Sequence, residues 1–234
     1  MTTIASRITD LFRRRKPVPP PSTFEPKNYW EARHRTHGHG LRSAGHLLLT
    51  DEENAHQYET KSMHLERFIR RHVTQPEGCS MLDAGCGTGL LAPCYKRLGF
   101  NVVGIDFSET AARRARQQTA YDSVVVSSLY NLGIQCQFDV IVTADVLLHI
   151  VNDTHWRDTI SSLSHQLKPG GFWFVLDYCR PLTGPPSLHC RTRPVALLAK
   201  TLDVLGYTIV ETDHIELIHE NVVKDLLAIT ASSG

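Results

Sequence analysis

The sequence predicts an α/β fold in which helices cover both faces of a parallel sheet. Short runs rich in β-branched and other apolar residues alternate along the chain with segments of helical periodicity, the order that parallel strands and crossover helices require. The first clear strand ends in a glycine-rich turn that opens a helical segment. Ligands of such sheets bind at the carboxyl ends of the strands, so polar residues at those ends are the main candidates for function.

The individual elements follow from these patterns in chain order. A helix is expected around 59–72, before the sheet begins. Strands are expected at 80–84, 101–105, 123–126, 138–143, 172–176, 207–212 and near 223–230, where the β-branched runs lie. Helices are expected between them at 89–98, 108–118, 153–167 and 195–205, where apolar residues recur every three or four positions.

Length and charge exclude several functional classes. The chain has 234 residues, enough for one α/β domain with a sizeable core, and its 25 Lys and Arg nearly balance 24 Asp and Glu. A net charge of +1 gives no general field to hold a nucleic-acid backbone. No apolar run is long enough for a membrane span or a secretory signal, so we expect a cytoplasmic protein. Six cysteines without a CxxC pair are typical of reduced thiols: Cys79, Cys86, Cys94, Cys136, Cys179 and Cys190.

Residues 1–25 differ in composition from the expected domain at 26–234. Four apolar residues fall on one helical face, and the basic run 13–16 leads directly into a proline-rich stretch. One interpretation is a basic amphipathic helix on an extended tether that touches an anionic membrane surface or a partner. The alternative, which we favour, is a solvated tail.

The glycine-rich turn predicts a particular kind of ligand. Its glycines stand at 85, 87 and 89, whereas a dinucleotide fingerprint has the spacing G-x-G-x-x-G. Asp83 just before the turn would repel a pyrophosphate but suits a cationic amino-acid end. Asp106 ends the next strand, where a carboxylate accepts hydrogen bonds from two ribose hydroxyls. The implied ligand has a ribose, no diphosphate and a positively charged tail.

Four segments in register resemble the class I S-adenosylmethionine-dependent methyltransferases. They are Leu82-Asp83-Ala84-Gly85-Cys86-Gly87-Thr88-Gly89, Gly104-Ile105-Asp106-Phe107-Ser108, Phe138-Asp139-Val140-Ile141 and Leu167-Lys168-Pro169-Gly170-Gly171. The resemblance covers about 60–230 and implies a Rossmann-like, seven-stranded sheet in the order 3-2-1-4-5-7-6 with the last strand antiparallel. It also implies S-adenosylmethionine as cofactor and methyl transfer as the activity.

The resemblance assigns the cofactor site residue by residue. The glycine loop would wrap the methionine moiety, Asp106 would bind the ribose and Phe107 would pack on the adenine. Many members place an acid after the third strand, whereas this chain has Ser127-Ser128-Leu129, so Ser128 or backbone groups would replace it. The expected cofactor contacts are Asp83, Gly85, Cys86, Gly87, Asp106, Phe107, Ser128, Leu129 and Asp145.

His149 is the candidate catalytic residue. A hydroxyl acceptor must lose its proton during transfer, and imidazole titrates near neutrality. The segment 144–150 resembles the E-V-L-E-H stretch of quinone-type and other small-molecule O-methyltransferases, with Asp145 and His149 matching and Leu148 replacing a glutamate. The alternative is that His149 only braces the loop that follows.

A metal is a second mechanistic possibility. Asp145 and Asp177 end two strands expected to be neighbours, and carboxylates there suit Mg²⁺, as in catechol-type methyltransferases, which look similar at these places. In the alternative interpretation Asp145 contacts the cofactor and Asp177 caps a loop. We favour this alternative and assign no metal site.

Two aromatic and basic segments are expected to shape the acceptor pocket. Tyr29, Trp30 and Arg33 resemble the Y-W-E-x-R lid of a subset of bacterial members, which places an N-terminal helical lid at 26–75. His189 and Arg191 precede the helix before the sixth strand, where the family often inserts acceptor-binding residues. Aromatic rings beside Arg and His suit a hydroxyl-rich acceptor such as a saccharide.

The sequence thus favours an O-methyltransferase acting on a small polar acceptor, with a saccharide preferred over a phenol. N-methylation of a small amine is the second hypothesis, and a non-catalytic cofactor-binding partner protein is the third. We expect no nucleic-acid substrate, because Ala144-Asp145-Val146 stands where an N-P-P-Y type turn would grip a flipped base. The oligomeric state is not predicted.

Overall fold

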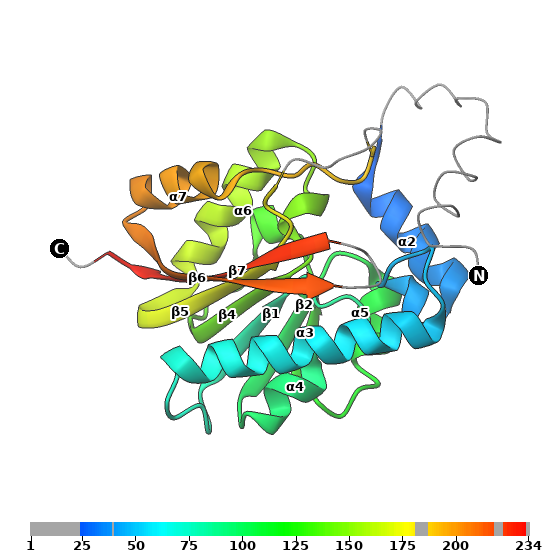
Figure 1. Cartoon of the computed structure of the whole chain (residues 1–234), viewed down its shortest axis with the longest axis horizontal. Helices are drawn as coiled ribbons and strands as arrows, with labels where there is room; N and C mark the ends of the chain where they lie inside the picture. The colour runs from blue at the N-terminus through cyan, green and yellow to red at the C-terminus, as the bar shows by residue number, and fades with distance from the viewer. Residues whose placement is uncertain (1–23, 39, 181–186, 218–221, 233–234) are drawn as a thin grey trace.

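The computed structural model describes residues 24–38, 40–180, 187–217 and 222–232. They form three layers, with a central sheet between two groups of helices (Figure 1). The expected tail at 1–25 lies almost wholly outside the described residues, and so does its basic helix.

The sheet has the predicted topology. Seven strands pair in the order β3-β2-β1-β4-β5-β7-β6, and β7 runs antiparallel to both of its neighbours, which confirms the expected order and the reversed last strand. The strands are β1 (Ser80–Ala84), β2 (Asn101–Asp106), β3 (Ser123–Val126), β4 (Phe138–Ala144), β5 (Leu167–Asp177), β6 (Tyr207–Leu217) and β7 (Val222–Ala231).

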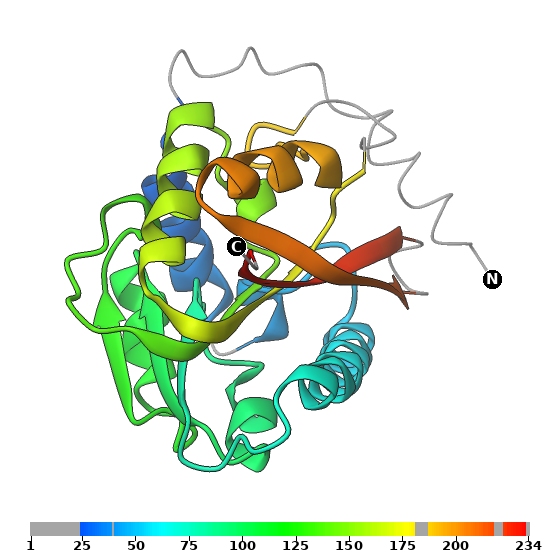
Figure 2. The same ribbon diagram turned by 90° about the vertical axis from the view of Figure 1, so that its left-hand side faces the viewer.

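Helices cover both faces of this sheet. The α-helices of the described residues are α2 (Pro26–His37), α3 (Asp51–His72), α4 (Ala92–Arg97), α5 (Glu109–Ala115), α6 (Asp153–His165) and α7 (Val195–Val204). Three short 3₁₀ helices in the described part of the chain, η1 (Leu41–Ser43), η2 (Leu129–Asn131) and η3 (Leu147–His149), lie in the loops. Figure 2 shows α6 and α7 on one side of the sheet and α3 on the other.

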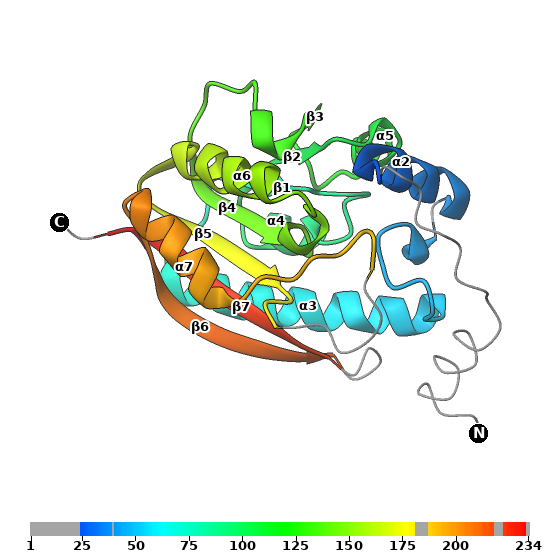
Figure 3. The ribbon, with the colours of Figure 1, turned by 90° about the horizontal axis from the view of Figure 1, so that it is seen from above.

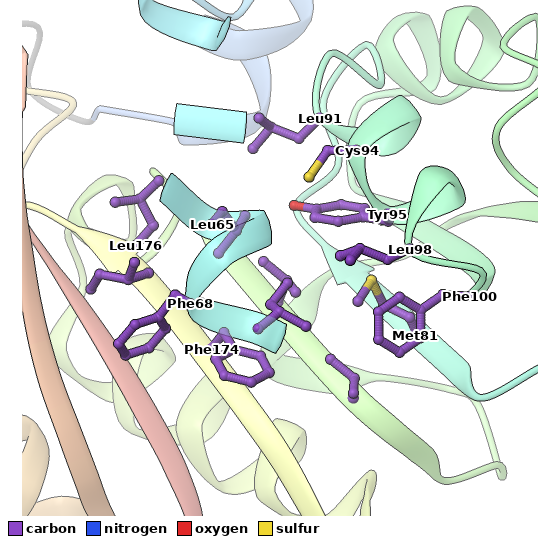
Figure 4. Close-up of a cluster of buried hydrophobic side chains, with 14 of the residues drawn as sticks. Leu65, Phe68, Met81, Leu91, Cys94, Tyr95, Leu98, Phe100, Phe174 and Leu176 are labelled. Carbon is purple, nitrogen blue, oxygen red and sulfur yellow. The ribbon is translucent and has the colours of Figure 1, made fainter. Parts of the chain in front are cut away.

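Alternating side chains on the strands build a separate core on each face. On β4, Val140 and Val142 face the cluster that contains α3 and α4, whereas Ile141 faces the cluster that contains α6 and α7. Figure 4 shows the first cluster, where Phe68 of α3 packs beside Phe174 of β5 at a ring separation of 5.9 Å. Both faces are therefore buried, as expected for a largely parallel sheet.

Element ends differ from the sequence prediction for local reasons. Helix α3 begins at Asp51, eight residues before the expected start, because Thr50 and Glu53 form a capping box ahead of any apolar periodicity. Helix α4 begins only at Ala92, since the glycine turn continues to Gly89, whose φ is +88°. Strand β6 continues five residues past its expected end, to Leu217, because its pairing with β7 extends that far.

The N-terminal segment lies at the carboxyl edge of the sheet. Helix α2 packs against α5 and η1, at the end where β1 and β2 finish (Figure 3). Among the helices that the structure describes, none has the length and apolar composition that crossing a membrane requires.

Candidate active site

A cavity of about 430 Å³ opens at the carboxyl edge of the sheet, beneath α2. Its volume falls in the range of small-molecule sites, roughly 300–1,000 Å³. The loops after β1, β2, β3 and β4 all contribute to its wall, as the strand pattern predicted. It is lined by all nine expected cofactor residues: Asp83, Gly85, Cys86, Gly87, Asp106, Phe107, Ser128, Leu129 and Asp145.

The glycine loop is folded back on the end of β2. The backbone N–H groups of Gly85 and Cys86 donate to the carbonyl oxygen of Ile105 at 2.7 and 2.9 Å. Gly85 has a φ of +82°, and a Cβ there would lie 2.6 Å from Val146 Cγ2. Glycine is therefore required both by the backbone and by the packing.

Asp106 has the hydrogen-bonding capacity expected of a ribose-binding acid. Gly87 N donates to Asp106 Oδ2 at 2.9 Å, and Ser108 N donates to Oδ1 at 2.8 Å. Each carboxylate oxygen has a second acceptor site, so the group can still accept two hydroxyl hydrogen bonds. Burial raises the pKa of Asp106 to about 6, against the opposing effect of these backbone bonds.

Asp83 is a buried carboxyl without a cationic partner among the described residues. Its side chain accepts a hydrogen bond of 2.6 Å from the hydroxyl of Tyr121. Burial raises the pKa of Asp83 to about 7, and the nearby Asp106 carboxylate acts in the same direction. No cation of the described residues contributes to this pKa. A buried acid of this kind fits the ammonium group of an amino-acid ligand. Together with Asp106 for the ribose, it makes the cavity fit S-adenosylmethionine.

Asp145 takes part in a buried charge network rather than standing free for a metal. It follows β4 directly and is the one non-glycine residue with positive φ, +57°, among those the structure describes. Lys61 Nζ lies 2.8 Å from Oδ2, and Lys224 pairs with Oδ1. The two ammonium groups hold the pKa of Asp145 well below its usual range despite its burial. Both carboxylate oxygens of Asp145 are therefore already paired with lysines of the chain.

Asp177 holds the loop that carries His149. Its carboxylate accepts hydrogen bonds from the backbone N–H groups of Leu148 at 3.2 Å and Tyr178 at 2.7 Å. Burial, together with the charge of Asp145, raises the pKa of Asp177 to about 6. These bonds match the loop-capping alternative, and the residues present give no support to Mg²⁺ bound between Asp145 and Asp177.

His149 lies in η3 and lines the cavity. Its Nδ1 is 2.9 Å from the carbonyl oxygen of His189. Since a carbonyl only accepts, Nδ1 carries the proton, and Nε2 is the nitrogen with a free lone pair. The Trp30 ring meets the imidazole edge-on at 4.7 Å between centroids. Burial lowers the pKa of His149 to about 4, which keeps the imidazole neutral at physiological pH.

The lid residues have two distinct placements. Trp30 lines the cavity, and Tyr29 stacks on His189 with ring centroids 4.8 Å apart. The guanidinium of Arg33 instead donates to the carbonyl of Arg42 and lies over the Trp30 ring, 4.8 Å from its centroid. These contacts fasten α2 to the loop that follows it.

Arg191 also binds within the chain. Its guanidinium pairs with Asp153 at 2.8 Å, and its backbone N–H donates to the carbonyl of Leu148. Of the five expected acceptor-binding residues, only Trp30 therefore lines the cavity itself, while His189 supplies the carbonyl that orients His149.

Sequence reasoning missed the groups that come from distant segments. Lys61 and Lys224 are 84 and 79 residues from Asp145, and neither stands in a recognisable motif. Glu31 binds Ser108 Oγ at 2.6 Å and also Thr110, which joins α2 to the start of α5. A signal for Glu31 was available, because it is the acid of the Y-W-E-x-R stretch.

The central part of the chain matches a known protein family. A family model described as a methyltransferase domain matches residues 81–171. That range begins in β1 with the glycine loop and ends in β5, so it includes the cofactor side of the cavity and η3.

Several curated relatives carry one name, ubiquinone biosynthesis O-methyltransferase. The protein of this name from Caulobacter vibrioides is 39% identical over 127 residues, which cover 50% of this chain and 49% of that protein. The mitochondrial protein of this name from Dictyostelium discoideum is 29% identical over 127 residues, covering 47% and 39%. The match thus spans about half the length or less of these relatives.

Solved structures share the fold at low sequence identity. Magnesium protoporphyrin IX methyltransferase from Synechocystis PCC 6803, with bound S-adenosylhomocysteine, has a TM-score of 0.69 at 18% identity, covering 88% of this chain and 98% of that one. The 1,6-didemethyltoxoflavin-N1-methyltransferase of Burkholderia thailandensis has a TM-score of 0.65 at 17% identity, covering 93% and 94%.

Proposed function

Because the chain belongs to the class I S-adenosylmethionine-dependent methyltransferases, we propose that it transfers a methyl group to a hydroxyl of a small polar acceptor. The observation that carries this proposal is the placement of His149. Its ring lines the same cavity as the whole expected cofactor set, with Nδ1 fixed by the carbonyl of His189.

The cofactor end of the cavity would hold its ligand through three groups. S-adenosylmethionine supplies a methyl group on a positively charged sulfur, which is transferred in line to the acceptor. Asp83 would bind the ammonium group, and Asp106 would bind the ribose hydroxyls beside the Gly87 backbone. Phe107, Ser128 and Leu129 would enclose the adenine. Such alignment is the principal need of this reaction, since a neutral thioether is a good leaving group.

His149 would remove the acceptor's proton. The hydrogen bond to His189 fixes one tautomer and leaves Nε2 as the base, so no reorganisation of the ring is needed. A positioned general base contributes roughly 10²- to 10⁴-fold to the rate. The Trp30 ring packs against the imidazole, with centroids 4.7 Å apart, and this contact would limit rotation of the imidazole ring.

The cavity wall is largely apolar but carries several polar side chains that an acceptor could contact. Beyond the cofactor set, Glu25 and Lys27 line it from the lid side, and Asn152 and His155 line it from the segment that follows η3. Such side chains can hydrogen-bond several hydroxyls, and the Trp30 ring offers an apolar face. We therefore retain a saccharide as the favoured acceptor. The relatives' name supports transfer to oxygen in general.

The test is a methyl-transfer assay over a panel of sugars, phenols and amines. The rate is measured as the release of S-adenosylhomocysteine. We expect a hydroxylated acceptor to turn over and His149→Ala to lose at least about 10²-fold in kcat, with cofactor affinity unchanged. The matched control is His165→Ala, an exposed histidine at the end of α6. If His149→Ala retains the wild-type rate on that acceptor, His149 is not the base.

N-methylation is the second candidate, and one observation favours it. With a pKa near 4, the imidazole of His149 is a weak base, whereas a neutral amine needs no base to attack the methyl group. One of the structural neighbours is itself named as an N-methyltransferase. Turnover of amines alone, insensitive to His149→Ala, would replace the O-methyl proposal. Cofactor binding without any product would instead favour a non-catalytic partner protein.

A further inference from the structure

The lid helix presents to the cavity one buried histidine that the mechanism above does not use. His34 is 3% exposed and lines the same cavity as Asp106 and Phe107. Its Nδ1 is buried and has no hydrogen-bond partner among the described residues. Buried polar atoms in folded proteins are bonded in the large majority of cases. A buried atom without a partner at the wall of a ligand cavity therefore points to a ligand.

Two contacts hold the segment of α2 around His34 against α5. The guanidinium of Arg114, on α5, donates to the backbone carbonyl of His34. One turn earlier on α2, the Glu31 carboxylate binds Ser108 and Thr110 at the start of α5. Ser108 and Thr110 follow the end of β2, so this turn of α2 lies near the carboxyl end of β2. His34 lines the cavity that Asp106 also lines.

The charge state of the ring restricts what it can bind. Burial and the neighbouring Arg33 and Arg114 lower the pKa of His34 to about 4, so the ring is neutral at physiological pH. A neutral imidazole has one N–H donor and one lone pair, which match a hydroxyl group. Recognition of a phosphate or carboxylate would favour a protonated ring instead.

We propose that His34 binds a ribose hydroxyl of the cofactor's nucleoside half through Nδ1, from the side opposite the protein core. The proposal rests on the cofactor site described under the proposed function. Asp106 would approach the ribose from the end of β2, and His34 would approach it from the lid. Helix α2 then contacts the cofactor directly through His34, while Trp30, four residues earlier, contacts His149.

The test measures binding of two probes by calorimetry, S-adenosylhomocysteine and 5′-methylthioadenosine, which keeps the ribose but lacks the amino-acid end. We expect His34→Phe to weaken both by about five- to tenfold, the net effect of one hydrogen bond. His34→Asn, whose amide lies close to the position of Nδ1, should keep binding within about threefold, whereas the longer His34→Gln should resemble Phe. His37→Phe, on the same helix but away from the cavity, should bind as wild type.

The outcomes separate this inference from the proposed function. If wild type does not bind S-adenosylhomocysteine, the cofactor site itself is refuted. If wild type binds but His34→Phe weakens only S-adenosylhomocysteine, the ring serves the amino-acid end and the ribose assignment is wrong. Unchanged binding of both probes also overturns it. If His34→Phe fails to fold, the comparison of His34→Asn with His34→Gln tests the proposal. Equal losses of binding affinity in these two variants contradict a contact through Nδ1.

Discussion

Replacing Asp83 by Asn should make the ligand-free protein more stable while weakening cofactor binding. The carboxyl group is buried near the end of β1, with the Tyr121 hydroxyl as its hydrogen-bond donor. The Asn side chain can accept the same hydrogen bond, and it cannot ionise. The variant therefore removes the buried charge while preserving the packing.

The magnitude follows from the pKa of Asp83. Folding raises it from 3.8 to about 7, so the native state binds the proton more tightly than the unfolded chain does. The free energy of unfolding therefore falls as pH rises from about 4 to about 7, by up to about 4 kcal/mol in total. The Asp83→Asn variant lacks this contribution, whereas those of Asp106 and Asp177 remain in both proteins. The variant's stability advantage should grow by about 2 kcal/mol between about pH 5.5 and about pH 8.

Urea denaturation of both proteins without ligand, at several pH values in that range, measures this difference directly. Asp203→Asn, at an exposed position on α7, is the matched control and should show no such gain over wild type. Calorimetry should show wild-type affinity for S-adenosylhomocysteine rising as Asp83 ionises, and weaker binding with a flatter pH profile in the variant. Parallel stability profiles for wild type and Asp83→Asn would refute the reasoning.

Three further outcomes are expected. Hydrogen bonds from Ser108 and Thr110 outweigh burial and lower the pKa of Glu31 to about 2, so Glu31→Gln should cost about 1–3 kcal/mol near neutral pH. That difference should disappear as pH falls from 4.5 to about 2, and no pH dependence in parallel denaturation curves would contradict it. Gly85→Ala should lower the urea midpoint of unfolding markedly, because Gly85 has a positive φ and a Cβ there would collide with Val146. A midpoint equal to that of wild type would mean that the loop adapts freely. A strong chelator should change the methyl-transfer rate by less than about twofold relative to untreated enzyme, since lysines already pair with Asp145. Loss of activity that Mg²⁺ restores would contradict this expectation.

The predictable part of the fold was the part encoded in local patterns. Strands 80–84 and 123–126 have the predicted bounds, because each is a short apolar run bounded by turn residues. The early start of α3 was missed because its first turn is acidic and carries no apolar periodicity. The extension of β6 to 217 depends on its partner β7, which a local pattern does not report.

In the candidate site, too, only the residues that stand in local motifs could be predicted from the sequence. Asp83, Gly85 and Asp106 stand in contiguous motifs, so their common cavity could be expected from the order of the strands. The pairing of Lys61 and Lys224 with Asp145 joins three elements far apart in the chain, and only the folded structure brings them together. Arg33 was expected at the acceptor, but its guanidinium donates to backbone carbonyls in the loop that follows α2, and no local pattern of the sequence indicates this contact.

The joint between α2 and α5 has a consequence for the rate of turnover. With the lid in this position, Glu31 holds Ser108 and Thr110 directly beside the acid that would bind the ribose. If spent cofactor leaves beneath the same helix, these bonds would oppose its escape as well as the entry of fresh cofactor. When such a cover must open in each cycle, product release rather than chemistry limits many enzymes. Weakening the joint would then shorten the residence time of the product, and a modest loss of stability would be accompanied by faster multiple turnover.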